Sequence, residues 1–383
     1  MEKSLYAQIV EKYFPQLVLN VVELLNGQRG ATLPYFHKQW LDNVYSADGR
    51  WTSILAEYTR VAADVVALDS EIPLKQRDTV DFVSGNIPKL GQKLALTEKQ
   101  MKDLDAILRD SNPQLSRVIN ILFGDTRRVI EAVWERIEDI FLSELSTGVG
   151  ISERDNGTGV RIDMGFYDKN KFEVDTPWKG NPTTCLPLED IQKVFDRAMD
   201  DNNTITDVFA DDNALLPFYT SKEVRGQFAF NQGIGLTQDG VPVLDFDKAR
   251  QVFATKWGVT LHRVARKIKT EINGQKNNHS PWAKGILAFT CDEKLGNLVY
   301  TDTAEATRRV GGVEYQIADE YILVSKYSKN DPLREFTMSQ AMAVPVLNNV
   351  DRIYLLDTKV PEPTTSTSST SSSSSTSSNA PTI

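Results

Sequence analysis

Residues 125–146 read DTRRVIEAVWERIEDIFLSELS and are the most strongly patterned segment of the chain. Their apolar residues recur at spacings of three and four, which places them on one face of a helix, and the charged residues fall largely on the other faces. The Asp125 carboxylate is expected to cap the first turn, and Gly148 to end the helix. The apolar face comprises Val129, Val133, Ile137, Ile140, Phe141 and Leu145. We therefore predict one long amphipathic helix laid across a core.

Helical spacing also appears elsewhere. Residues 5–25 favour helical segments that Pro15 interrupts, and together they resemble an arm that docks on another surface. Thr97-Glu98-Lys99-Gln100 matches a capping box, so a short helix is expected to follow as far as Leu108. Two further helices are predicted at Pro187–Met199 and Phe246–Trp257.

Strand-forming runs complete the pattern. They occur at Ile286–Thr290, Leu298–Thr301, Tyr321–Tyr327 and Ile353–Leu356, and they indicate the α+β class. Upstream of the long helix, residues 61–74 are rich in β-branched residues, and Pro73 favours an edge or a loop. Residues 81–95 contain Gly85, Pro88 and Gly91 and are interpreted as the return limb of a long, hairpin-like excursion.

The composition of the chain argues against several classes of protein. With 52 acidic and 43 basic residues, the net charge of -9 argues against general affinity for DNA, so any such contact should be local or weak. Cys185 and Cys291 are too few for a disulfide scaffold and favour free thiols in a reducing cytosol. Neither a signal peptide nor a membrane span is indicated. After Val360 a Ser/Thr-rich tail offers no apolar residues to bury, so we predict that it is disordered.

The search for chemistry yields no site. His37, His262 and His279 belong to no zinc-ligand spacing, and they are interpreted as surface or packing residues. Gln232-Gly233-Ile234-Gly235 lacks the third glycine of a dinucleotide-binding loop, which favours a turn. The pairs Asp200-Asp201 and Asp211-Asp212 are expected in solvated loops. No catalytic, cofactor-binding or metal-binding residue is therefore predicted, and no cofactor.

Residues 261–284 contain a concentration of basic side chains. Their cations are opposed only by Glu271, while apolar residues between Leu261 and Ile272 recur at helical spacing. An amphipathic helix with a basic exposed face explains the pattern, and contact with another subunit or with DNA stays open. The cations are Arg263, Arg266, Lys267, Lys269, Lys276 and Lys284.

Two motifs carry a resemblance to a known family. DPLREFTMSQ, residues 331–340, resembles the C-terminal signature of the lambda-type major capsid proteins, the capsid protein E family of tailed bacteriophages. RIDMG, residues 161–165, resembles the short strand that follows the long helix of that family. The excursion at residues 61–95 is similar to its extended loop.

The resemblance implies the HK97-type phage capsid fold. By position, residues 1–50 would be the N-terminal arm, 51–100 the extended loop region and 101–180 the peripheral domain with its long spine helix. Residues 181–330 would be the axial domain, 331–359 the return into the peripheral domain and 360–383 the disordered tail.

The resemblance also implies a function. The chain would be the major capsid protein of a phage head, a homo-oligomer of hexamers and pentamers that close into an icosahedral shell around the DNA genome and expand as DNA enters. Scaffolding, decoration and portal proteins and a weak, non-specific contact with packaged DNA are the implied partners. The virion is the implied location, with assembly in the host cytoplasm and no catalysed reaction.

Physical reasoning adds one expectation. A two-stranded excursion is only marginally stable alone in water, so residues 66–96 should make their contacts between subunits. Two other classes stay open. A tail-tube or encapsulin-like shell protein would differ in the particle it forms, and a soluble enzyme with an unrecognised site would remain small on a sizing column.

Overall fold

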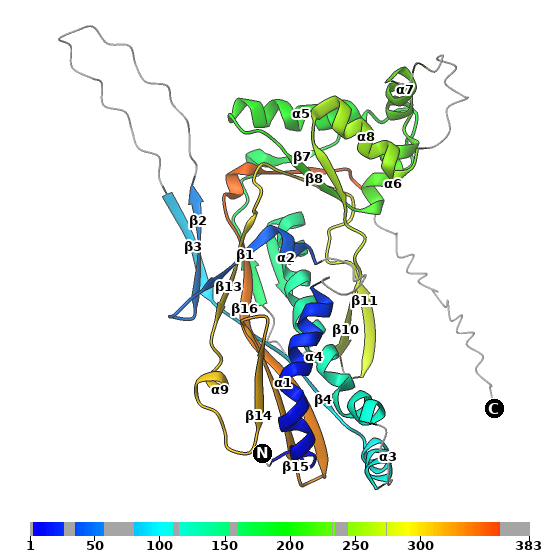
Figure 1. Ribbon diagram of the computed structural model, residues 1–383. Coiled ribbons are helices and arrows are strands. Elements are labelled where there is room, and N and C mark those ends of the chain that lie inside the picture. The colour runs from blue at the N-terminus through cyan, green and yellow to red at the C-terminus, as the bar shows by residue number, and fades with distance from the viewer. Residues whose placement is uncertain are drawn as a thin grey trace, which may run out of the picture.

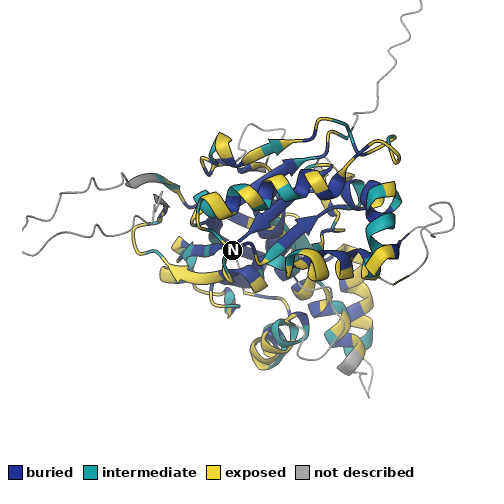
Figure 2. Ribbon diagram, turned by 90° about the horizontal axis from the view of Figure 1, so that it is seen from above, coloured by how far each residue is buried: buried dark blue, intermediate teal, exposed yellow. Residues whose placement is uncertain are grey.

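The structure is a computed structural model that describes residues 3–26, 35–56, 80–109, 115–152, 160–231, 233, 244–272 and 274–360. Its buried apolar residues form two clusters, each built around its own sheet. Figure 1 shows the two bodies one above the other, with a cluster of helices at the top and the longest helix, α4, in the lower body. Buried strands make up the interior and helices with one exposed side surround them (Figure 2).

The lower body is a six-stranded sheet on which α4 (Leu115–Thr147) packs. Five strands follow the order β1-β13-β16-β15-β14, and β4 also pairs with β16. Their bounds are β1 Leu41–Tyr45, β4 Lys89–Ala95, β13 Gly296–Thr301, β14 Glu314–Ala318, β15 Ile322–Lys329 and β16 Arg334–Leu347. Around them lie α1 (Ala7–Leu25), α2 (Phe36–Trp40), α3 (Glu98–Leu108) and α9 (Ala304–Thr307).

The upper body has a five-stranded sheet in the order β7-β17-β12-β8-β9. These strands are β7 Lys171–Glu173, β8 Asp207–Ala210, β9 Thr260–Arg263, β12 Ile286–Thr290 and β17 Ile353–Asp357. Its helices are α5 Pro187–Asp200, α6 Asp212–Thr220, α7 Lys222–Asn231 and α8 Phe246–Trp257. Two 3-10 turns, η1 (Asp168–Asn170) and η2 (Val350–Arg352), lie beside β7 and β17 in sequence.

Three two-stranded ribbons project from or cover these bodies. β2 (Arg50–Ala56) pairs with β3 (Val80–Asn86), β5 (Val149–Ser152) with β6 (Val160–Asp163), and β10 (Ile268–Ile272) with β11 (Gln275–His279). The β2-β3 ribbon projects to one side in Figure 1, while the Ser53 hydroxyl of β2 donates to the Leu347 oxygen of β16 at 2.6 Å. The β10-β11 ribbon runs beside α4. No helix in the described part of the chain is both long and apolar enough to cross a bilayer.

The long helix is confirmed, but its predicted start was wrong. The helix begins at Leu115, and Asp125 lies inside it, 3.3 Å from Arg128. Buried Val118 and Leu122 extend the apolar face by nearly two turns, which overrides the capping signal at Asp125. Gly148 ends the helix as expected, with φ of 79°, a left-handed conformation that glycine adopts without strain.

The expected interruption at Pro15 is also wrong. α1 runs unbroken through Pro15, which lies on the exposed side of the helix. Val10, Phe14 and Val18 on the opposite side are buried against the lower body. Packing of this apolar face therefore compensates for the one backbone hydrogen bond that proline removes.

Several expected elements are confirmed. The capping box at Thr97 is present with both of its reciprocal hydrogen bonds. α5 and α8 occupy the predicted helical stretches, and β12, β13, β15 and β17 occupy the predicted strands with small shifts at their ends.

The basic amphipathic helix is wrong, because the stretch folds as β9, β10 and β11. Ile268, Thr270 and Ile272 alternate with charged residues, which is a strand pattern. β9 gains a parallel partner in β8, and Gly274 turns β10 into β11 with φ of 77°. The apolar residues of this stretch thus fit both a helical and a strand spacing. Hydrogen bonding to neighbouring strands favours the strand.

The excursion is confirmed in part. Its return limb, β3, pairs with β2 as a hairpin, whereas residues 61–74 with Pro73 lie outside the described residues. The expectation of contacts only between subunits was wrong for β4, which pairs with β16 of its own chain. Gly91 lies so close to β16 that a Cβ there would sit 2.6 Å from the Ser339 oxygen. The tail after Val360 also lies outside the described residues.

Candidate functional site

The DPLREFTMSQ stretch forms the turn after β15 and the first half of β16. β16 is an interior strand, bonded to β15 over residues 334–340 and to β4 over residues 336–342. Side chains alternate along a strand, so Glu335, Thr337 and Ser339 share one face. All three are polar and at most 3% exposed. The sheet therefore presents a buried polar row, which requires partners.

Helix α4 supplies two of those partners through its own backbone. The Ser339 hydroxyl donates to the main-chain oxygen of Val129 at 2.6 Å. The Lys326 ammonium, on β15, donates to the main-chain oxygen of Leu122 at 2.7 Å and to Thr337 Oγ1 at 3.0 Å. Two turns of helix separate Leu122 from Val129, so both oxygens lie on the same side of α4. The sheet thus fixes the rotation and position of the helix.

Lys326 is unusual because its charge is fully buried. Burial lowers the pKa of its ammonium to about 8, while the nearby Glu335 and Asp125 carboxylates act in the opposite direction. A cation in such a place is tolerated only when its donors are occupied. The contacts with Leu122 and Thr337 occupy two of its three donors.

Glu335 joins the N-terminal segment to the same strand. Its carboxylate accepts from Ser4 Oγ at 2.5 Å and from the Leu5 amide at 3.2 Å. Ser328 donates to the Lys3 oxygen at 2.7 Å, and the Tyr6 hydroxyl donates to Asp105 at 3.0 Å. The beginning of α1 is therefore anchored to its own subunit at the motif.

The RIDMG stretch lies at the other end of α4. β6 pairs with β5, and the Met164 amide donates to the Gly148 oxygen at 2.8 Å. Ile162 and Met164 are buried, whereas Arg161 and Asp163 are exposed. Both motifs thus contact or flank the same helix, and together they form what we call the α4 seat: Lys326, Glu335, Thr337 and Ser339 with the β5-β6 hairpin.

The three histidines each meet a carboxylate but do not lie together. His37 Nδ1 is 2.6 Å from Glu138 Oε2 on α4, and Glu138 also accepts from the Phe36 and His37 amides. Burial tends to raise the pKa of Glu138, but the hydrogen bonds and charge of His37 hold it below its ordinary value. His279 lies 2.6 Å from Asp139, and His262 lies 2.7 Å from Asp207.

The remaining candidates have structural places. Asp211 is not in a solvated loop, which corrects the expectation. It is buried, caps α6 through the Ala214 amide at 3.1 Å and accepts from Gly285 at 3.1 Å. Asp201 forms the C-cap of α5. Gly233, the described residue of the 232–235 segment, lies in a turn with φ of 65°.

The cysteines and metal-ligating side chains form no centre. Cys185 and Cys291 are free and buried, and burial raises the pKa of the Cys291 thiol to about 12. Such a thiol is a poor nucleophile at neutral pH. Within the described ranges, no group of three or more His, Cys, Asp or Glu side chains is placed to hold a metal ion.

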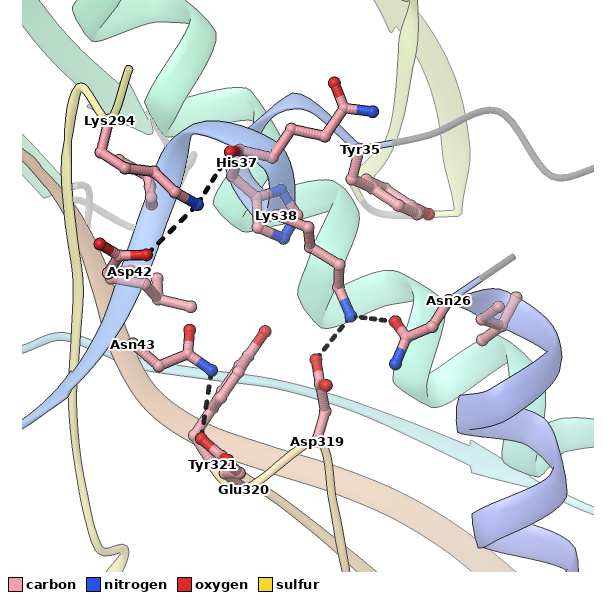
Figure 3. Close-up of a pocket in the computed structure, with 14 residues that line it drawn as sticks. Asn26, Tyr35, His37, Lys38, Asp42, Asn43, Lys294, Asp319, Glu320 and Tyr321 are labelled. Carbon is pink, nitrogen blue, oxygen red and sulfur yellow. Dashed lines mark hydrogen bonds and ion pairs between the residues drawn. The ribbon is translucent and has the colours of Figure 1, made fainter. Parts of the chain in front are cut away.

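A polar hollow of about 660 Å³ lies between β1 and the β14-β15 turn. Figure 3 shows its charged side chains directed toward one another across the hollow. Lys38 binds Asp319 at 2.6 Å, and Lys294 binds Asp42 at 3.2 Å. The Asn43 amide donates to Glu320 at 3.2 Å. These ion pairs and the hydrogen bond thus connect the two sides of the hollow.

A sequence profile of the phage major capsid protein E family matches residues 56–356, a range that contains α4, RIDMG and DPLREFTMSQ. The chain belongs to this family. It is a major capsid protein, the structural subunit from whose copies a phage shell is built. The residues that seat α4 are therefore the framework of a shell subunit.

Solved structures show the fold of this major capsid protein. A chain described as a prophage capsid protein from Escherichia coli CFT073 superposes with a TM-score of 0.55 at 14% identity, over 90% of this chain and 98% of that one. A phage-related protein from Bordetella bronchiseptica RB50 has a TM-score of 0.49 at 9% identity, with 90% and 96% covered. The fold is the HK97-type capsid fold, of the α+β class. A comparison with curated proteins finds no match.

Sequence reasoning missed the polar seat of this major capsid protein. No sequence pattern marks Lys326, and Glu335, Thr337 and Ser339 stand out only as parts of the family motif. The alternation of small or charged polar residues at 335, 337 and 339 was the available signal. It indicates one shared face of a strand, although it does not say which face is buried.

Proposed function

We propose that the subunit assembles into hexamers and pentamers of an icosahedral phage head that encloses the DNA genome. The main support is that the family match spans both the long helix α4 and the interior strand β16 that contacts it, so this chain contains the framework of a shell subunit. The β2-β3 ribbon supports this proposal, because a two-stranded ribbon gains stability from a neighbouring surface. Rings of subunits require such heterologous contacts.

The two bodies suggest a division of roles. We assign the peripheral role to the body that contains α4 and the six-stranded sheet, and the axial role to the body that contains α5 to α8. Strands β13, β14 and β15, within the range 181–330, pair in the sheet under α4 and belong with the peripheral body in this assignment. The proposed extended loop is centred on the β2-β3 ribbon, and the proposed arm includes α1.

The proposed partners follow from charge and location. Scaffolding, decoration and portal proteins would meet the shell during assembly in the host cytoplasm, and the finished subunit would reside in the virion. A net charge of -9 keeps contact with packaged DNA weak. The exposed Lys267, Lys269 and Lys276 beside or on the β10-β11 hairpin would confine such contact to one place. The subunit catalyses no reaction in this proposal.

The test is direct observation of particles. The full chain, expressed with and without a scaffolding protein, should give rings or closed shells in negative-stain electron micrographs. A 43.0 kDa species alone in sedimentation, at every salt and protein concentration and with scaffold supplied, would contradict the proposal. Tubes would instead indicate a tail-tube protein, and shells loaded with protein cargo an encapsulin-like one.

A further inference from the structure

The carboxyl group of Glu144 is buried without a partner. Glu144 lies in the last turns of α4 with no exposed surface, and neither of its side-chain oxygens has a hydrogen-bond partner. Buried carboxylates are normally paired with a cation or several amides, as Glu138 is two turns earlier on the same helix. The contrast between the two residues indicates that they do not carry the same charge.

The β5-β6 hairpin covers this carboxyl. Gly150 on β5 lies directly against it, so closely that a Cβ at this position would sit 2.5 Å from Glu144 Oε1. The hairpin starts at Gly148, whose φ of 79° makes the sharp turn out of α4. Near this turn the hairpin is fastened by the Ser143 hydroxyl, which donates to the Val149 oxygen at 2.9 Å. Lifting β5 from the helix would therefore expose Glu144.

Burial alone sets the protonation of Glu144. It raises the pKa of this carboxyl well above its ordinary value, and no charged group contributes to the shift. On α4 the nearby Asp139 is already paired with Arg136 and His279. On β6 the charged Arg161 and Asp163 are exposed, and on the loop that contacts Ser146 the charged Lys284 is exposed as well. A neutral carboxyl is thus the form that fits, since an unpaired buried charge is far more costly.

We propose that Glu144 is a proton-controlled latch: the β5-β6 hairpin lies on α4 while this carboxyl is neutral and lifts when the carboxyl ionises. The hairpin is the element that yields, because it consists of two strands of 4 residues each, and ribbons of this size are marginally stable alone. α4 itself is held by the sheet through Ser339 and Lys326. The ionised carboxylate therefore reaches water by lifting of the hairpin, with the helix in place.

Hydrogen exchange read by mass spectrometry tests the latch on the full chain. Peptides that contain β5 and β6 are followed between pH 6 and pH 9.5 in the wild type and in Glu144→Gln, which is neutral at every pH. Comparing the two proteins at each pH cancels the intrinsic pH dependence of exchange. While Glu144 is neutral in the closed hairpin and ionised in the open one, each further pH unit should raise hairpin opening in the wild type by about 10-fold, because opening releases one proton. Glu144→Gln should show no such rise.

Two further variants keep the test decisive. Glu131→Gln, a control on the same helix whose carboxylate is partly exposed and paired with Arg127, should keep the wild-type response. Glu144→Leu should behave like Glu144→Gln. It is used in place of Glu144→Gln if burying the glutamine side-chain amide prevents that variant from folding. The proposal is overturned if wild type and the residue 144 variants respond alike. It is also overturned if protection of α4 is lost together with that of the hairpin, because the opening would then be global.

Discussion

The Ser339 hydroxyl donates to the main-chain oxygen of Val129 at 2.6 Å, in the middle of a 33-residue helix. In an α-helix this oxygen also accepts from the backbone amide four residues later, so the Ser339 contact is additional to the helical hydrogen bond. Together with the hydrogen bond from Lys326 on β15 to the Leu122 oxygen at 2.7 Å, it ties two neighbouring strands of the sheet to the backbone of α4. The position of α4 thus depends on polar contacts as well as on its apolar face.

Replacing Ser339 with alanine should lower the free energy of unfolding by about 1 kcal/mol, the usual net value of one hydrogen bond. Urea denaturation of the purified subunit measures the change. Ser280→Ala is the matched control on the surface, and it should alter the free energy by less than about 0.5 kcal/mol. Equal effects of the two substitutions would show that the Ser339 contact contributes nothing specific.

Burial of the Lys326 ammonium predicts that the stability of the subunit depends on pH above neutrality. The pKa of this group is about 8 in the folded chain and ordinarily 10.5, so the folded state binds fewer protons than the unfolded state between these values. The contribution of this group to stability is complete above 10.5 and is lost as the pH falls through 8. Wild type should therefore gain stability relative to Lys326→Met across this window, by about 3 kcal/mol. Urea midpoints of both proteins between pH 7 and pH 10.5 provide the measurement, and parallel curves would refute the assignment.

The His37 and Glu138 pair predicts a pH dependence of the same sign in acid, with stability lost as the pH falls. The pKa of Glu138 is held below its ordinary value, so its stabilisation is present above that value and is lost as the pH falls through the lowered one. Glu138→Gln should destabilise the subunit by about 3 kcal/mol at pH 7, because His37 and two backbone amides lose a charged acceptor. Thermal unfolding between pH 3 and pH 7 should show a smaller acid loss in the variant. An identical acid loss in both proteins would place the sensitivity elsewhere.

Removal of the extended loop should separate folding from assembly. Replacing residues 57–79 with a short Gly/Ser linker leaves β2, β3 and β4 intact, so the circular dichroism of the subunit should match the wild type. Electron micrographs should show that shells no longer form. Normal shells would mean that the loop is not an assembly element, and an unfolded variant would mean that it belongs to the core.

Deletion of residues 361–383 should leave the melting temperature unchanged. This segment contains no large apolar residue before Ile383, so it has little surface to bury in the fold. Differential scanning calorimetry of the shortened and full chains gives the comparison. A clear drop in melting temperature would show that the segment packs on the subunit.

Local patterns predicted much of the framework. The spacing of apolar residues in α4 and the capping box at Thr97 depend only on neighbours within a few residues, so both could be predicted from the sequence. The strand at Ile268 was misread because its apolar residues fit a spacing of four as well as alternation. Only its pairing with β11 distinguishes a strand from a helix here, and this pairing cannot be inferred from residues 268–272 alone.

The seat of α4 was beyond such reasoning for a different reason. Glu335 and Ser4 are separated by 331 residues, and His37 and Glu138 by 101, so no short window contains both partners. A buried polar row also looks like an exposed one in sequence, because alternation does not reveal which face the core covers. The family motif contains Glu335, Thr337 and Ser339 without giving their role, and Lys326 lies outside it.

The positions of β16 and β17 in the two sheets affect how the chain can fold during translation. The two are consecutive strands near the end of the sequence, yet β16 is an interior strand of the lower sheet and β17 an interior strand of the upper one. A nascent chain that has reached residue 333 lacks the central strand of one sheet and an interior strand of the other. Neither sheet can be completed on the ribosome before residues 334–357 have been translated. Chains that stop before residue 334 should therefore expose unpaired strand edges and aggregate, which makes synthesis through β17 a precondition for an assembly-competent subunit.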